Sequence, residues 1–337
     1  MRIGVNPEKQ EPTLHIESYH RVVIPVYIPN LEEDYFKDGL VVLKLCLESL
    51  FATIHSKTKV SLIDNGCCNE VRAYLSELYN TNDTVDQLLL SKINLGKVNA
   101  LYSAIKSNLE PLITIADSDV MFLPSWQQEV EQLHYDFPEA GLVSPVPSST
   151  AFASPFNKST LFYGFFKAKI KAAKVQDPDG MIKFQDSIGR EMYSKNHLEQ
   201  YLTISNKKSQ AVIGSGHFVA TLKAQVFRNA PEEICQAKIV GGSENKYIDV
   251  PNDKGGFLRL STMGNFAYHL GNQAEDWMHK RMEQICNEAI DNPILPELPA
   301  VKPISGFGYW MGGVIRKIFF VKLKKSYLKA KGIKQPY

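Results

Sequence analysis

The chain has 337 residues, of which 44% are hydrophobic and 22% charged, as expected of a soluble globular protein with a large core. Its net charge of +2 combines −7 over residues 1–297 with +9 over the remainder, so the acidic body is poorly suited to nucleic acid. The five cysteines lack metal-ligand spacing, and the sequence shows neither a signal-peptide pattern nor a run of about 20 apolar residues. We therefore expect a cytoplasmic protein without a disulfide framework, zinc site or membrane span.

The first 120 residues alternate between strand and helix patterns. Short apolar runs predict strands at 21–27, 59–63, 88–90 and 111–116, and helical periodicity predicts helices at about 40–55, 69–79 and 98–107. This order predicts an α/β fold with a doubly wound, mostly parallel sheet flanked by helices. The carboxyl ends of parallel strands share one edge, so we expect five polar residues to converge there: Asp64, Asn94, Lys97, Asp117 and Asp119.

Asp117-Ser118-Asp119 is the most informative of these motifs. An Asp-x-Asp triplet by itself is more often a solvated loop, but this one directly follows the predicted buried strand 111–116. Two carboxylates at that edge provide hard oxygen ligands for Mn²⁺ or Mg²⁺, either of which neutralises a diphosphate.

The second half is less regular. Residues 156–175 predict an aromatic-rich helix or a lid, 177–180 a turn, and 217–221 a strand. Residues 291–312 contain four prolines and predict an extended linker after a domain at 1–290. Residues 313–337 predict a basic amphipathic helix that either contacts an anionic membrane or packs on the domain with its basic side in solvent.

Four short motifs follow one another at the ends of the predicted strands: Ile24-Pro25-Val26-Tyr27, Ile63-Asp64-Asn65-Gly66, Asn94-Leu95-Gly96-Lys97 and Asp117-Ser118-Asp119. Residues 21 to about 125 thereby resemble the nucleotide-sugar half of family 2 glycosyltransferases, which have the GT-A fold. Farther on, Tyr268-His269-Leu270-Gly271-Asn272 resembles the late His-x-Gly element of that family. The resemblance implies a nucleotide-sugar half at about 20–125 and an acceptor half at about 126–290.

The resemblance also implies roles for individual residues. Asp119 would bind the metal directly, with His269 as the third protein ligand; the alternative for His269 is a histidine at a strand end. Asp64 would accept hydrogen bonds from the base, taken as uracil, and Lys97 would pair with a phosphate. Gly216 would lie beside the donor sugar, or belong to a plain turn. The remaining donor-binding residues would be Pro25, Val26, Tyr27, Asn94, Asp117 and Ser118.

An inverting transfer also needs a carboxylate that takes the acceptor proton. The family places a Glu-Asp pair some two dozen residues before the late histidine. In this chain Glu244 occupies that place, and Asn245 replaces the aspartate. Glu244 is the first choice for the base, with Asp249 and Asp253 as alternatives; each is otherwise a solvated loop carboxylate.

The expected function is that of a metal-dependent inverting glycosyltransferase, peripheral on the inner face of the cell membrane. It would transfer a sugar from a UDP-linked donor to a hydroxyl of a glycan or lipid-linked glycan in surface polysaccharide synthesis. Two alternatives stay open. Asn245 leaves room for a non-catalytic nucleotide-sugar-binding scaffold, and a sugar-1-phosphate nucleotidyltransferase is disfavoured because Pro29 to Glu33 is not a Gly-rich phosphate loop.

Overall fold

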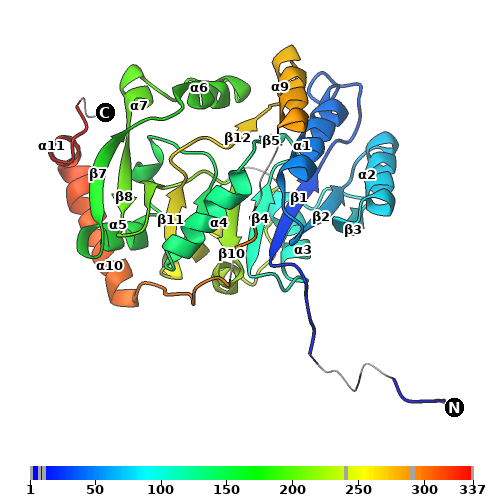
Figure 1. Cartoon of the computed structure of the whole chain (residues 1–337), viewed down its shortest axis with the longest axis horizontal. Coiled ribbons are helices and arrows are strands. Elements are labelled where there is room, and N and C mark those ends of the chain that lie inside the picture. Colours follow the sequence, from blue (N-terminus) through cyan, green and yellow to red (C-terminus); the bar gives the residue numbers. More distant parts are fainter. Residues whose placement is uncertain are drawn as a thin grey trace.

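Four parallel strands form the N-terminal half of the sheet, in the spatial order β3, β2, β1, β4 (Figure 1). The computed structural model describes residues 3–6, 9, 13–238, 242–288, 293–295 and 297–334. The strands are β1 (His20–Val26), β2 (Thr58–Asn65), β3 (Val85–Ser91) and β4 (Leu112–Ala116). The helices between them are α1 (Gly39–Thr53), α2 (Asn69–Thr81) and α3 (Lys97–Ile105). These elements confirm the predicted alternation to within a few residues at each end.

The β1 sequence shows why helices cover both faces of this half. Val22, Ile24 and Val26 share a buried cluster with α1, α2 and α4 (Trp126–Asp136). Val23 points to the other face and packs in the cluster of α3. Successive strand residues alternate between faces, so a fully apolar strand needs a helical layer on each side.

The complete sheet is mixed, which corrects the prediction of a mostly parallel one. Over the described residues it has ten strands in the order β3-β2-β1-β4-β10-β6-β11-β9-β8-β7. β10 (Val219–Lys223) is antiparallel to both β4 and β6 (Ala140–Ser144), and β6 is parallel to β11 (Leu258–Ser261). The remaining strands pair antiparallel: β9 (Gln210–Ile213), β8 (Gln200–Ser205) and β7 (Lys169–Lys174). Short connections such as 206–209 allow only antiparallel pairing.

A two-stranded ribbon leaves this sheet at the end of β4. It joins β5 (Val120–Phe122) to β12 (Ala267–His269) and places His269 opposite Val120. The helices between β6 and the C-terminal segment are α5 (Lys158–Phe166), α6 (Pro178–Ser187), α7 (Lys195–Glu199), α8 (Val250–Lys254) and α9 (Asp276–Asn287), with short helical turns at Ala151–Ala153, Ala224–Asn229 and Asn245–Asp249.

Two predictions for the second half were wrong in detail. Residues 156–175 form α5 followed by β7 rather than one helix or a lid. Residues 177–180 begin α6 rather than a turn, because Asp177 caps the helix by accepting from the Gly180 N–H and Pro178 occupies its first position.

The C-terminal segment is not one helix. It comprises α10 (Gly306–Ile315), a π-helical stretch η5 (Arg316–Lys322) and α11 (Lys324–Ala330), with a break at Leu323. Ile315, Phe320 and Leu328 are buried in the core that α5 and β7 also line. The segment therefore packs on the domain, and among the described helices none is both long and apolar enough to cross a membrane.

Candidate active site

The pocket with the predicted polar residues lies at the carboxyl ends of β1, β2 and β4. Its volume is about 530 Å³. Among its lining residues are seven that the sequence predicts for the donor or metal: Pro25, Tyr27, Asn94, Lys97, Asp117, Ser118 and Asp119. Of the five polar residues expected to converge at this edge, all except Asp64 line the pocket.

The pocket also has an aromatic side that the sequence analysis missed. Tyr35 and Phe36 line it, and the Phe36 ring meets Tyr27 edge-on at 6.0 Å between centroids. Lys238 and Asn272 complete the lining from distant parts of the chain. The only sequence signal for Tyr35 and Phe36 was their position shortly after the first strand.

Asp117, Asp119 and His269 form a group able to hold a metal ion. One ligand atom from each lies within 4.8 Å of the others. The Asp119 carboxylate approaches His269 Nε2 at 3.4 Å, and its Oδ1 is buried without a hydrogen-bond partner. Burial raises the pKa of Asp119 to about 6. A buried oxygen with nothing to satisfy it favours a cation between these groups.

The tautomer of His269 fits metal binding. Ser187 Oγ donates to the Phe184 carbonyl at 2.7 Å and lies 3.0 Å from His269 Nδ1. With that hydroxyl hydrogen engaged, Ser187 is placed to accept from Nδ1–H; in this tautomer the lone pair of His269 is on Nε2, on the side of Asp119. A metal-binding imidazole is usually held in this way through its other nitrogen. Two carboxylates and one imidazole suit Mn²⁺ or Mg²⁺.

Lys97 stands at the first position of α3 and connects the metal group to the predicted base. Its ammonium forms ion pairs with Asp117 and, at 2.5 Å, with Glu244 Oε1. Although burial favours the neutral amine, the two carboxylates raise the pKa of Lys97. Gly96 precedes it with φ +81°, and a side chain there would collide with the Ala237 carbonyl, so glycine sets the entry to α3.

Glu244 also meets His217, which sequence reasoning did not assign. His217 Nε2 lies 3.2 Å from Glu244 Oε2, and its Nδ1 lies 3.4 Å from Asp249 Oδ2. Burial opposes the charged ring, but Asp249 and Glu244 raise the pKa of His217 to about 9. Burial likewise opposes the Glu244 carboxylate, but His217 and Lys97 lower its pKa to about 2. Glu244 is therefore ionised and doubly paired at neutral pH.

The two alternative carboxylates have other partners. Asp249 is fully buried and forms an ion pair with Arg259 Nε at 3.1 Å. Asp253 accepts from the Ser159 N–H at 2.9 Å in the first turn of α5, and burial raises its pKa to about 6. Neither lines the pocket. Among the three predicted carboxylates, Glu244 is the one joined to a pocket residue, through Lys97.

Three residues predicted for the donor do not line the pocket: Asp64, Val26 and Gly216. The Asp64 carboxylate is fully buried, accepts from the Gly66 and Cys67 N–H groups, and pairs with Arg72 Nε at 2.6 Å. Both of its oxygens therefore have partners within the protein, and its predicted contact with the base stays a prediction. Asn65, the next residue, lines the pocket instead.

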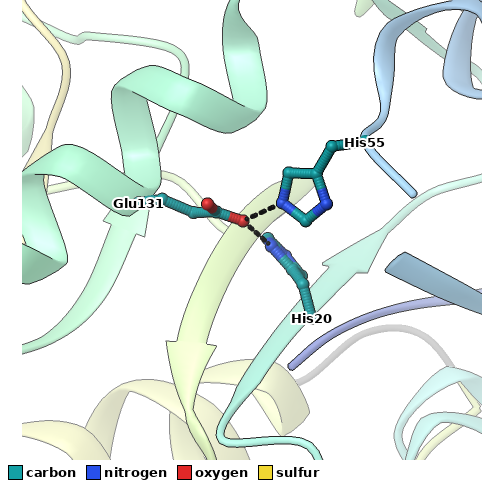
Figure 2. A group of neighbouring side chains, drawn as sticks. All are labelled: His20, His55 and Glu131. Carbon is teal, nitrogen blue, oxygen red and sulfur yellow. Dashed lines mark hydrogen bonds and ion pairs between the residues drawn. The ribbon is translucent and has the colours of Figure 1, made fainter. Parts of the chain in front are cut away.

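A second cluster of ligand-type residues has a different character. His20, His55 and Glu131 meet in the core, as Figure 2 shows, with Glu131 Oε1 2.6 Å from His20 Nδ1 and 3.0 Å from His55 Nε2. His55 Nδ1 accepts from the Lys57 N–H, so its proton is on Nε2 and points at Glu131. Burial opposes the charge of Glu131, but hydrogen bonds from the two histidines lower its pKa to about 2. This cluster is a hydrogen-bonded network at the amino ends of β1 and β2.

The fold and the pocket together define an α/β protein with a metal-competent acidic site at the carboxyl edge of its sheet. No model of a known protein family matches the chain, and no curated protein matches its sequence. Among solved structures, it is similar to a mannosyltransferase from Pyrobaculum calidifontis in complex with GDP-Man and Mn²⁺. The identity is 14% and the TM-score 0.40, over 72% of this chain. The match spans 54% of the mannosyltransferase, or about half its length.

Proposed function

We propose that this chain is a metal-dependent inverting glycosyltransferase with a GT-A fold, resembling family 2. The observation that carries the proposal is the group Asp117, Asp119 and His269 beside a pocket of about 530 Å³. The group lies at the sheet edge where open α/β folds bind ligands. The motif order along the chain supports the same function.

In this proposal the pocket holds a nucleotide sugar, UDP-linked. The aromatic side formed by Tyr27, Tyr35 and Phe36 offers rings to the base and ribose. The diphosphate lies toward Asp117, Asp119 and His269, which would hold Mn²⁺ or Mg²⁺. Such an ion supplies stabilisation of the charge that develops on the leaving diphosphate.

Glu244 is the base of the proposed reaction. The acceptor hydroxyl attacks the anomeric carbon opposite the diphosphate and gives its proton to Glu244. A carboxylate with a pKa near 2 is a weak base, so its activation requires a change in its ion pairs. Arrival of the diphosphate draws Lys97 away from Glu244, and the loss of this cation raises the pKa of Glu244 toward the range of an effective base.

The acceptor in this proposal is a glycan or lipid-linked glycan of surface polysaccharide synthesis, used at the inner face of the cell membrane. The support is chemical: an acceptor on a membrane requires an enzyme that reaches its surface. The C-terminal segment, with nine basic residues after Glu297, is the part of the chain suited to that contact.

A thermal-shift panel of nucleotide diphosphates, each with and without Mn²⁺, tests the donor site. A ligand that binds the native state alone raises Tm by mass action. We expect a Mn²⁺-dependent rise with one nucleotide and its loss in Asp119→Ala. The control is Asp83→Ala, which removes an exposed carboxylate from the turn before β3, away from the pocket.

The alternatives give different results in the same experiments. No Mn²⁺-dependent shift with any nucleotide would contradict the donor site. A shift without hydrolysis or transfer of the matching nucleotide sugar would favour a scaffold, which the paired state of Glu244 and the presence of Asn245 make the second candidate. Pyrophosphate release from a nucleoside triphosphate and a sugar phosphate would indicate a nucleotidyltransferase.

A further inference from the structure

The inner side of α10 is made of glycines that lie directly on α5. A side chain at Gly312 would overlap the Lys158 carbonyl, and one at Gly308 would press on Phe162 and Ile304. The two helices run beside each other at one end of the sheet, the end opposite β3 (Figure 1). This close approach fixes the rotation of α10 about its axis and determines which residues face outward.

The outer side of the same helix carries its largest apolar side chains. Phe307 and Trp310 are 66% and 60% exposed, and their ring centroids lie 5.9 Å apart. Val314, Ile318 and Val321 follow at intervals of three or four residues, and Val321 is 56% exposed. A helix that served only to cover the domain would bury its aromatics and expose its small residues. Here the arrangement is reversed, and an exposed apolar stripe of this kind is typical of an interaction surface.

Exposed cations accompany the C-terminal part of this stripe. Lys317, Lys322 and Lys325 are exposed within η5 and α11 or at their ends, and no acidic residue follows Glu297 in the sequence. Aromatic residues beside lysines match the boundary between headgroups and acyl chains of an anionic bilayer. A protein partner of equal apolar area would need an acidic rim, whereas anionic lipid supplies both properties in one surface.

We propose that the outer side of α10 and η5, defined by Phe307, Trp310, Val314, Ile318 and Val321, docks on an anionic lipid bilayer. This surface differs from the one that the sequence indicated. Ile315, Phe320 and Leu328 are committed to the protein core, and the aromatics that enter the lipid lie before residue 313. The docking is peripheral, with α10 lying along the bilayer and the lysines at the level of the phosphates.

Flotation of the full chain with vesicles tests the surface. We expect binding to vesicles of three parts phosphatidylcholine to one part phosphatidylglycerol, and little to phosphatidylcholine alone. Phe307→Ser combined with Trp310→Ser should reduce the bound fraction by about tenfold or more, since two aromatic anchors are lost. The matched control is Tyr79→Ser with Leu109→Ser, which removes two exposed apolar residues from the nucleotide half.

Two triple variants test how much the lysines contribute to vesicle binding. Lys317→Gln with Lys322→Gln and Lys325→Gln should weaken anionic binding by about tenfold or more and reduce its dependence on salt. Lys92→Gln with Lys106→Gln and Lys280→Gln changes the net charge equally at exposed positions elsewhere and should leave binding intact. Each variant is first shown to be folded by its unchanged Tm.

Several outcomes would overturn the proposal. One is that the wild type does not bind vesicles, and another is that a control variant loses as much binding as the variant it is matched to. The third is that light scattering shows a dimer, which Phe307→Ser with Trp310→Ser dissociates. The last result would mean that a second copy covers the surface. Because the assay contains no nucleotide or metal, its failure leaves the proposed chemistry untouched, and failure of the donor assay leaves this surface untouched.

Discussion

Glu244 is the residue on which the proposed chemistry depends most. Glu244→Gln keeps the shape of the side chain and removes its ability to take a proton. We expect the nucleotide-dependent rise in Tm to remain and the transfer rate to fall by about 10²- to 10⁴-fold. Product formation from the matching nucleotide sugar measures the rate, and Glu232→Gln, an exposed change, is the control. Retained turnover would assign the base to Asp249 or Asp253.

His217 gives the site a dependence on pH. Its pKa rises from 6.5 to about 9 on folding, so the native state holds the proton more tightly than the unfolded chain. The resulting stability is complete below pH 6.5 and is lost as pH rises to about 9. It amounts to about 3 kcal/mol at most.

Urea unfolding of the wild type and His217→Asn at pH 6, 8 and 10 measures this contribution. We expect the free energy of unfolding of the wild type to fall more steeply toward pH 10 than that of the variant. Parallel curves would mean that His217 does not carry its charge in the native state.

At the scale of single elements, the packing of α10 on α5 requires that Gly312 has no side chain. Gly312→Ala places a methyl group against the Lys158 carbonyl, and we expect it to cost about 1 to 3 kcal/mol. Gly313→Ala, one residue farther along, meets its nearest neighbour at an ordinary 3.7 Å and should be neutral or stabilising by up to about 1 kcal/mol. Thermal denaturation of both variants measures the difference. Equal effects would contradict the packing of α10 on α5.

The elements predicted well from the sequence are those with one dominant pattern. Strands such as 111–116 are short, apolar and bounded by polar residues, so their ends and shared edge follow from local chemistry. The prediction of a single helix after residue 313 was wrong. The apolar residues of this segment pack against α5 and β7, and this tertiary contact leaves no helical periodicity in the sequence. Asp177 was assigned to a turn because Asp-Pro-Asp-Gly fits both a turn and the start of a helix.

In the site too, features set by local sequence could be predicted and those set by tertiary contacts could not. Asp117 and Asp119 could be placed because they come directly after a strand, and Lys97 because it begins the helix that follows the third strand. Asp64 lies at the end of β2, but its carboxylate is paired with Arg72, a contact between side chains that the motif does not encode. His217 was missed because its partners Glu244 and Asp249 come from a separate helical turn.

At the scale of the molecule, the two predicted halves share one sheet. β10 belongs to the second half and pairs with β4 of the first over five residues, from Val219 opposite Ala116 to Lys223 opposite Leu112. We therefore expect a single unfolding transition in urea, with coincident curves from circular dichroism and from tryptophan fluorescence. Buried Trp126 reports on the packing of α4 against β1 and β5, since its ring contacts His20 and Phe122. Two separated transitions would show that the halves fold independently.

The insertion of β10 also sets an order of events on the ribosome. When β4 has been synthesised, one of its edges has no partner until residues 219–223 appear. At about 5 to 20 residues per second, the intervening residues 117–218 take roughly 5 to 20 s to make. During that interval the nascent chain presents an apolar strand with free N–H and C=O groups, the kind of edge that recruits other strands. Chaperone dependence during synthesis should accordingly be greatest for chains stalled between these two strands.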